Sequence, residues 1–363
     1  MLLKFKPYVR VLLNQEELKV IISRPLKDGD LGDIFELTPM GLDIIILLKD
    51  AISKEDIIKK LGIRSQSELE EMNEILDLLI RENYIGFENE YINNEDKDIE
   101  SIYERVIPIW GEIESENNNR YQIQRSIMSK KVGLIGCGTL GMGIISKLIT
   151  NGVSNFILVD DDTVSRTNLT RQPAFLLKDI GKPKVEVAKQ YIFDRTENPQ
   201  VTIYNKKVKN LLDLTIFNDV DILVVASDEY GVDELVQKYG NEKKITLSFS
   251  GDYTGSTGKI FPIVIPGKTH NYTCAHNYLY SVIGKDKKGF KDINNKFTIS
   301  SITSIADFIV SISSFEILKY LTGAMQPYLI NKILFFNFAN YTIDEINIDS
   351  EDCNCLNMSE LEC

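Results

Sequence analysis

The chain has 363 residues, which is more than one typical domain needs and predicts two. Its formal net charge is −12, which excludes binding by general attraction to nucleic-acid phosphates or to an anionic membrane. No apolar run reaches the roughly 18–20 residues of a membrane span, and the N-terminus lacks a signal-peptide core. Five cysteines, mostly far apart, do not indicate a disulfide framework, so we expect a cytoplasmic protein.

The first ninety residues combine short β patterns with helical ones. Runs rich in β-branched and aromatic residues predict three strands, at Tyr8–Asn14, Glu17–Ser23 and Asp33–Pro39. Capping residues and apolar periodicity then predict three helices, at Met40–Leu48, at Lys54–Leu61 and from Ser67 onward. With YIGFENEYI as a β wing, residues 1–92 are expected to form a small winged-helix-like α+β domain.

An acidic stretch separates this region from the rest of the chain. From Glu88 to Glu116 there are ten acidic residues against Lys97 and Arg105, and the stretch ends in the run ESENNN, so residues 93–125 are the expected linker. Such a composition is typical of a solvated linker, here with a short helix around Ile99–Trp110.

From residue 126 onward, strand patterns alternate with helical ones. The expected strands lie in the apolar runs VGLIG, FILVD, VTIYN, DILVVAS, ITLSF and ILFFNF. This alternation predicts right-handed βαβ units and a mostly parallel sheet. We therefore expect residues 126–363 to form one Rossmann-like α/β domain.

A glycine-rich loop follows the first of these strands. Gly136, Gly138 and Gly141 have GxGxxG spacing between a strand and a helix, where backbone N–H groups can approach a phosphate. Asp160 ends the next strand, where its carboxylate can accept hydrogen bonds from ribose hydroxyls. These residues predict a nucleotide site and fit NAD and ATP equally well.

Polar and basic residues beyond Asp160 favour ATP. Asn168, Arg171 and Gln172 form one tight run, and Lys184 begins the next helix. A triphosphate requires such cations on oxygens that gain charge as pyrophosphate leaves, whereas hydride transfer does not. Two further groups, Ser227 and Asp228, follow another strand at the ligand side of such sheets, where an Asp can hold Mg²⁺. The alternative is that the cations lie on solvated faces and Asp228 caps a helix.

Residues 131–230 resemble the ThiF/MoeB superfamily, the adenylating enzymes related to ubiquitin activators. The motifs that carry the resemblance are GCGTLG, DDDTVSRTNLTRQ, GKPK and ASD. The resemblance implies that Asp160 and Asp162 lie at the nucleotide and that Asp228 is associated with Mg²⁺. It also implies that Asn168, Arg171, Gln172 and Lys184 act on the phosphates and the adenylate, and that the protein is a homodimer. The apolar run Thr303–Leu321 offers surface for such a dimer.

The chain departs from the family's usual structural zinc site. Two CxxC pairs are replaced by NYTC, with Cys274, and by CNC, with Cys353 and Cys355. A site completed by His276 or Cys363 is the alternative to a lost site, and we expect the loss. The family's opening RYxRQ segment also differs, since Ile123 stands where its second Arg belongs.

The first domain resembles the PqqD-like peptide-recognition element of peptide-modifying enzymes. That resemblance implies that a precursor's leader peptide adds a strand beside Asp33–Pro39 and lies against the third helix. The residues expected to contact it are Ile34, Phe35, Glu36, Leu37, Leu76, Leu79 and Ile80. A winged helix that binds DNA is disfavoured, because its third helix is strongly acidic.

The function expected from these features is ATP-dependent adenylation of a carboxylate on a ribosomally made peptide. Among adenylating enzymes, the run NLTRQ and the PGKT stretch are most similar to the microcin C-type peptide adenylating enzymes. One alternative is a non-catalytic leader-binding scaffold for a partner cyclodehydratase. Another is an activator of a ubiquitin-like sulfur carrier.

Overall fold

The protein is described here by a computed structural model that covers residues 2–24, 27, 32–87, 94–115, 118–229, 231–282, 300 and 302–348. The chain folds into two compact units, Met1–Gln124 and Arg125–Cys363. The expected fold class, a Rossmann-like α/β unit preceded by a small α+β unit, is confirmed.

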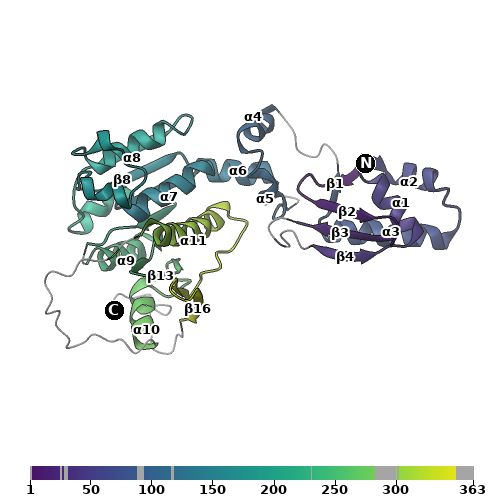
Figure 1. The fold of residues 1–363 in the computed structure, drawn as a ribbon. Coiled ribbons are helices and arrows are strands. Elements are labelled where there is room, and N and C mark those ends of the chain that lie inside the picture. Colours follow the sequence, from purple (N-terminus) through teal and green to yellow (C-terminus); the bar gives the residue numbers. More distant parts are fainter. Residues whose placement is uncertain are drawn as a thin grey trace. The chain divides into compact units, whose positions relative to one another are not determined.

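Two three-stranded antiparallel sheets and three helices make the body of the first unit (Figure 1). One sheet has the order β5-β1-β6, formed by β5 (Ile52–Ser53), β1 (Leu2–Phe5) and β6 (Ile85–Phe87). The other has the order β2-β3-β4, formed by β2 (Arg10–Asn14), β3 (Lys19–Ser23) and β4 (Asp33–Glu36). The last three are the expected strands, shortened at their ends, whereas β1 was not predicted.

The three helices begin at side-chain caps. Thr38 caps α1 (Pro39–Leu47), and Ser53 caps α2 (Lys54–Leu61), which ends at Gly62 with φ 65°. The third helix, α3 (Gln66–Arg81), starts earlier than expected, because Ser65 and Glu68 form a reciprocal capping box.

The helix α3 turns its most apolar side chains inward. Leu76 and Leu79 are 0% and 4% exposed and belong to the core of the first unit, whereas Ile80 is 38% exposed. The expectation that all three residues offer an outer wall to a peptide is therefore wrong for Leu76 and Leu79. Apolar spacing identified the buried face of the helix, and only Ile80 lies at its border.

The acidic segment after the wing is helical and clusters with the first unit. It contains α4 (Asn94–Tyr103), α5 (Ile107–Gly111) and the start of α6 (Arg120–Ser129). The Tyr8 hydroxyl donates to the carbonyl of Gly111, and the indole of Trp110 donates to Gln124 Oε1 at 2.7 Å. The first contact attaches the segment to the strands before it, and the second joins α5 to α6 within the segment, although the composition is that of a solvated linker.

A six-stranded sheet forms the centre of the second unit, in the order β14-β11-β10-β7-β8-β9. Five of the strands are parallel: β7 (Lys131–Ile135), β8 (Asn155–Val159), β9 (Gln200–Tyr204), β10 (Ile222–Val225) and β11 (Thr246–Phe249). Only β14 (Ile263–Val264) is antiparallel, at the edge. The chain runs from β7 to β9 on one side and resumes with β10 on the other, so the order reverses between β7 and β10. A nucleotide is expected outside the carboxyl ends of these two strands.

The last strand expected in the parallel sheet lies elsewhere. All but the last residue of the run ILFFNF lie in β15 (Lys332–Asn337), which pairs antiparallel with β13 (Thr257–Ile260) and β16 (Thr342–Asn347). With β12 (Asp252–Thr254) they form a separate four-stranded sheet. A tight turn joins β15 to β16, and such a turn forces antiparallel pairing, whereas a parallel neighbour requires a long crossover.

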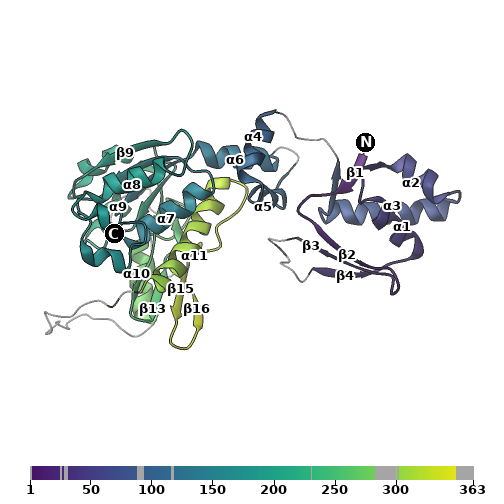
Figure 2. The ribbon, with the colours of Figure 1, turned by 45° about the horizontal axis from the view of Figure 1, so that its top comes forward.

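Helices pack on the parallel sheet and on one another. One core cluster joins sheet residues to η3 (Leu211–Phe217), α9 (Val232–Lys243) and α10 (Tyr272–Val282). The helices α7 (Thr139–Thr150) and α11 (Thr303–Thr322) lie side by side (Figures 1 and 2), and a Cβ atom at Gly143 would meet Val310 at 2.6 Å. The remaining elements are α8 (Lys184–Phe193) and two short 3₁₀ helices, η1 (Arg166–Thr170) and η2 (Leu177–Asp179).

The apolar run expected to supply dimer surface is largely buried within one chain. Ile309, Ile317 and Leu321 of α11 are at most 1% exposed. The argument for a homodimer from unused apolar surface is therefore wrong. Across the described residues, no helix combines the length and the hydropathy needed to cross a bilayer.

The two sides of α3 predict different effects on stability. We expect Leu76→Ala to lower the unfolding free energy of the first unit by about 2–5 kcal/mol, because it opens a cavity in the core. The matched control Ile80→Ala should change it by about 0.5 kcal/mol or less. Trp110 is the single tryptophan of the chain and lies in this unit, so its fluorescence during urea unfolding follows the unit selectively. Equal destabilisation by both variants would contradict the placement of α3.

Candidate functional site at the sheet switch point

The glycine loop lies between the carboxyl ends of β7 and β10. Gly136 has φ 95°, and a Cβ atom there would meet the Ala226 carbonyl oxygen at 2.5 Å. At Gly141 a Cβ atom would lie 1.9 Å from the Gly136 oxygen. Gly138 differs, because the nearest atom to its Cβ position is Gln172 Nε2 at 3.7 Å. Two glycines are therefore required for packing, while Gly138 borders open space at the start of α7, where helix N–H groups attract anions.

Asp160 connects the glycine loop to the segment after β8. Its Oδ2 accepts a hydrogen bond from the Cys137 amide at 2.6 Å, and its Oδ1 accepts one from the Asp162 amide at 2.8 Å. Burial raises the pKa of this carboxyl, although the two amide hydrogen bonds act in the opposite direction. Asp160 therefore stands beside the glycine loop, where a ribose hydroxyl is expected.

Lys184 is held against Asp162. Its Nζ lies 2.6 Å from Asp162 Oδ2, and its amide donates to the Asp162 carbonyl at 2.9 Å. The side chain of Lys184 is 8% exposed and that of Asp162 is 66% exposed, so the ion pair extends from a buried base to the surface. A β-bridge between Thr163 and Pro183 aligns the two segments. The sequence predicted both residues at the site but did not predict their pairing.

In the run from Asn168 to Gln172, one side chain holds the loop and two have polar groups that can contact a ligand. Asn168 is buried, and its Oδ1 accepts from the Ser165 amide at 2.8 Å, which completes the cap of η1. Arg171 is half-buried and donates from Nη1 to the Thr167 carbonyl at 3.0 Å, so most of its guanidinium donors are not used by this bond. Gln172 is 5% exposed, and within the described residues its Oε1 has no hydrogen-bond partner. Arg171 and Gln172 thus offer groups to a ligand, while Asn168 holds the loop.

The segment after β10 adds oxygen groups. The Ser227 hydroxyl accepts from the Glu229 amide at 3.2 Å, and the Asp228 side chain is exposed. A residue not predicted, Lys207, lies 3.2 Å from Glu229 and 3.9 Å from Asp161 and so links the segments after β8 and β10. The hydrogen bond to Glu229 raises the pKa of Lys207.

Carboxylates at this edge of the sheet are suited to a divalent cation. After β8, Asp160, Asp161 and Asp162 each place an oxygen within 4.8 Å of the others, and Asp228 follows β10, which lies on the other side of β7. Carboxylate oxygens are the ligands that Mg²⁺ prefers. The donor chemistry therefore fits the expected metal.

The described part of the chain contains two of the residues considered for zinc. Cys274 lies in α10, where its amide donates to Asn271 Oδ1 at 2.8 Å, and His276 follows on the same helix. Burial lowers the pKa of His276. The other candidate ligands, Cys353, Cys355 and Cys363, lie outside the described residues. Cys137 is buried, and burial raises the pKa of its thiol, which makes it a poor nucleophile.

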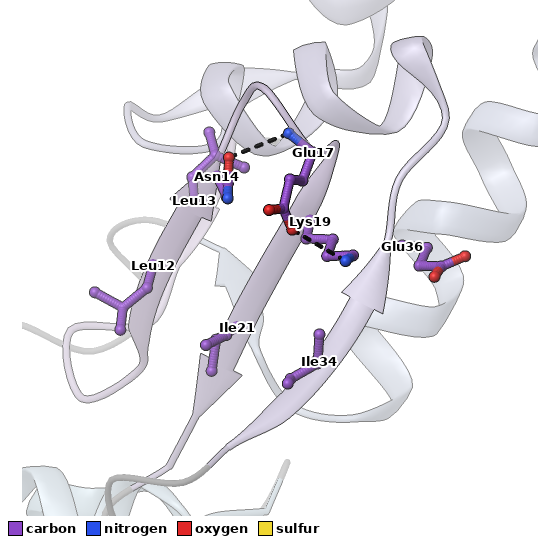
Figure 3. A pocket seen from close by; sticks show the side chains of 8 residues that line it. All are labelled: Leu12, Leu13, Asn14, Glu17, Lys19, Ile21, Ile34 and Glu36. Atoms are coloured by element: carbon purple, nitrogen blue, oxygen red, sulfur yellow. Dashed lines mark hydrogen bonds and ion pairs between the residues drawn. The ribbon is translucent and has the colours of Figure 1, made fainter.

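The expected peptide contacts of β4 point to two sides of its sheet. Phe35 and Leu37 pack on the core of the first unit, with the Phe35 ring edge-on to Tyr84 at 6.2 Å. Ile34 and Glu36 point the other way and border a shallow hollow of about 600 Å³ on the outer face (Figure 3). Among the described strands β4 pairs only with β3, so it is an edge of the sheet as expected.

The contrast between Gly138 and Gly141 gives a test of the phosphate position. We expect Gly138→Ala to fold normally but to bind ATP at least about tenfold more weakly, because its methyl group occupies the space beside the loop amides. Gly141→Ala should instead lower the melting temperature, since its methyl group overlaps the Gly136 oxygen. Calorimetry measures both effects. Unchanged ATP affinity in Gly138→Ala would place the phosphates elsewhere.

Solved structures with this arrangement cover the whole chain. E. coli MccB has a TM-score of 0.79 at 21% sequence identity, and the match covers 100% of this chain and 99% of that one. A structure of E. coli MccB with ATP has a TM-score of 0.77, also at 21% identity, with 98% and 99% of the two chains covered. The microcin C7 biosynthetic enzyme MccB in complex with N-formylated MccA has a TM-score of 0.76 at 20% identity, with 98% and 100% covered. At this level of identity the likeness shows the fold.

Curated relatives match over shorter stretches. The SAMP-activating enzyme E1 of Haloferax volcanii is 35% identical over 111 residues, which are 30% of this chain and 40% of that protein. The NEDD8-activating enzyme E1 catalytic subunit of Saccharomyces cerevisiae is 31% identical over 171 residues, 42% of this chain and 54% of that protein. The chain thus spans about half or less of the length of these relatives.

A family model gives the widest sequence match. The model of the ThiF family covers residues 103–357, which is more than half of the chain and includes the glycine loop, Asp160, Lys184 and Asp228. On this evidence the chain belongs to the ThiF family.

Proposed function

We propose that the protein uses ATP to adenylate a carboxylate on a ribosomally synthesised precursor peptide, in the biosynthesis of a bacteriocin-like or microcin-like product. The observation that carries the proposal is the joining of the glycine loop, Asp160 and the Asp162–Lys184 pair at the switch point of the sheet. The likeness to MccB, solved with ATP and with MccA, supports a nucleotide and a peptide as substrates.

In this reaction a carboxylate oxygen of the peptide attacks the α-phosphorus of ATP, and pyrophosphate leaves. Negative charge grows on the phosphate oxygens as the bond to the leaving group breaks, so fixed cations lower the barrier. Arg171 supplies a planar fork of donors and Lys184 a compact charge. Asp160 orients the nucleotide through the ribose, and Asp228 would hold Mg²⁺, which neutralises phosphate charge when bound.

The Asp162–Lys184 pair keeps the ammonium at the site before the nucleotide arrives. A buried ammonium without a partner is costly, and the exposed Asp162 carboxylate supplies the opposite charge. Because Asp162 is largely solvated, exchanging it for phosphate oxygens costs little. Lys184 is therefore preorganised for the developing charge.

The roles proposed for Lys184 and Asp228 predict large effects of their removal on catalysis. We expect Lys184→Ala and Asp228→Ala each to lower peptide-dependent pyrophosphate exchange by at least about 10²-fold. The matched control is Lys182→Ala, two residues away, since that lysine is half-exposed and pairs with Asp179 at 2.9 Å. Control and unchanged protein should exchange at similar rates. Full activity of Lys184→Ala would contradict the catalytic role proposed for Lys184.

The peptide partner and the oligomeric state belong to the same proposal. A leader peptide would bind the first unit, and a homodimer is proposed from the family resemblance alone. The proposed location is the cytoplasm. Neither nucleic acid nor membrane has a role in this proposal.

Two other functions make different predictions. A scaffold for a partner cyclodehydratase would bind the leader without pyrophosphate exchange. An activator of a ubiquitin-like sulfur carrier is favoured by the E1 relatives, which match less than half of this chain. The MccB likeness includes the first unit, and this observation favours the peptide.

A further inference from the structure

Three apolar side chains form a row across the outer face of the β2-β3-β4 sheet. The register pairs Leu12 with Ile21 and Ile21 with Ile34, so the row runs from one edge strand to the other. Leu12 is 43% exposed and Ile34 is 66% exposed. Figure 3 shows the row on one side of the sheet, open at β4. Exposed apolar side chains at a sheet edge are typical of a surface that a partner covers.

A charged row lies beside the apolar one. The register pairs Asn14 with Lys19 and Lys19 with Glu36. The Lys19 ammonium donates to Glu17 at 3.0 Å, as Figure 3 shows, whereas Glu36 lies on the outer strand and is exposed. At β4 the outer face therefore ends in an apolar group and, two residues along, in a carboxylate.

The backbone of β4 presents its free groups at these same two residues. The Leu37 amide donates to the Leu18 carbonyl at 2.7 Å, toward β3. In an antiparallel pair the N–H and C=O groups of successive residues point to alternate sides, so those of Phe35 also face β3. The backbone groups of Ile34 and Glu36 then face outward. An added strand would pair with these two residues and place side chains beside both.

We propose that the outer face of this sheet selects the peptide by a two-residue pattern, an apolar residue beside Ile34 and a lysine or arginine two positions away beside Glu36. The proposal rests on the proposed function, since it takes the occupant of the edge to be the peptide substrate. It assigns recognition to the face away from the helices of the first unit, in addition to contacts near Ile80.

Physical complementarity supports this occupant. A side chain beside Ile34 extends the row of Leu12 and Ile21 and removes apolar surface from water. A basic side chain beside Glu36 makes a favourable cross-strand pair of opposite charge. An extended segment with alternate residues of these kinds fits the edge, whereas a run of acidic residues is repelled.

The direction of the backbone N–H groups of β4 also determines at which residue a proline substitution tests peptide binding. Proline at residue 35 would remove a donor that faces β3 and would damage the sheet itself. Proline at residue 36 removes an outward donor, and edge strands tolerate it. We therefore choose Glu36→Pro as the backbone variant and Glu36→Lys as the side-chain variant. Glu17→Lys is the matched control, because Glu17 borders the same hollow but lies off the edge.

The probe is a random heptapeptide library displayed on phage, selected on the full-length protein with ATP. We expect enrichment of an apolar residue and a basic residue separated by one position. Synthetic peptides with this pattern should bind Glu36→Lys about 3- to 10-fold more weakly, and exchange of the basic residue for glutamate should restore affinity for that variant. Glu36→Pro should lose binding, and Glu17→Lys should keep it.

Two results would overturn the inference: an enriched pattern that is the same for the unchanged protein and for Glu36→Lys, or full binding by Glu36→Pro. Pyrophosphate exchange tests the proposed function separately. Peptides that bind with the expected pattern but support no exchange would sustain edge recognition and contradict adenylation. Pyrophosphate exchange with peptides whose binding does not depend on Glu36 would support adenylation and contradict edge recognition. A protein that self-associates through this edge would show a sedimentation change in Glu36→Pro without peptide, and that result would assign the surface to a second copy.

Discussion

Two amide hydrogen bonds to the Asp160 carboxylate hold the nucleotide site together. One comes from Cys137 in the glycine loop and the other from Asp162 on the way to η1. Because both acceptor oxygens belong to one side chain at the end of β8, the two loops keep a fixed spacing. The position of Lys184 depends on this spacing in turn, since its partner is Asp162. The carboxylate proposed to bind the ribose therefore also positions a group proposed to bind the phosphates.

The motifs predictable from the sequence are those whose parts are close in the chain. Gly136, Gly141 and Asp160 are placed by a strand, a tight turn and the next strand, so local patterns locate them. The pairing of Lys184 with Asp162 depends on a bridge between Thr163 and Pro183, which no local pattern encodes. Lys207 was missed for the same reason, because its partners Asp161 and Glu229 belong to loops that only the folded sheet brings together. At this site, ion pairs between loops could not be predicted from the sequence.

Composition was a weaker guide than polar contacts in the first unit. The segment before α6 is acidic, yet Glu114 is 9% exposed and lies 2.8 Å from the Lys6 ammonium and 3.6 Å from the Arg120 guanidinium. Glu114 therefore forms a largely buried ion-pair cluster with two cations, and removing one of these partners would strongly destabilise the fold. The same residue composition therefore serves as an anchor here rather than as a solvated linker. The spacing of apolar residues on α3 was predictable, but the depth at which each is buried was not, because it depends on how the two small sheets cover the helix.

The division into two units would separate the binding energy that selects the peptide from the binding energy that stabilises the transition state. In the proposed reaction, contacts of the first unit with a peptide would be the same before and during phosphoryl attack, so they would lower KM for the peptide without accelerating the chemical step. The proposed contacts of Arg171 and Lys184 would strengthen as charge grows on the phosphates, so they would act on kcat. The helix α6 carries the chain from one unit to the other, with the boundary after Gln124. Selection of the peptide can therefore change through β4 and its outer face while the nucleotide site stays as it is. Ile34 and Glu36 are exposed at a sheet edge, whereas Asp160 and Lys184 are held by hydrogen bonds and an ion pair, and such a division requires this contrast.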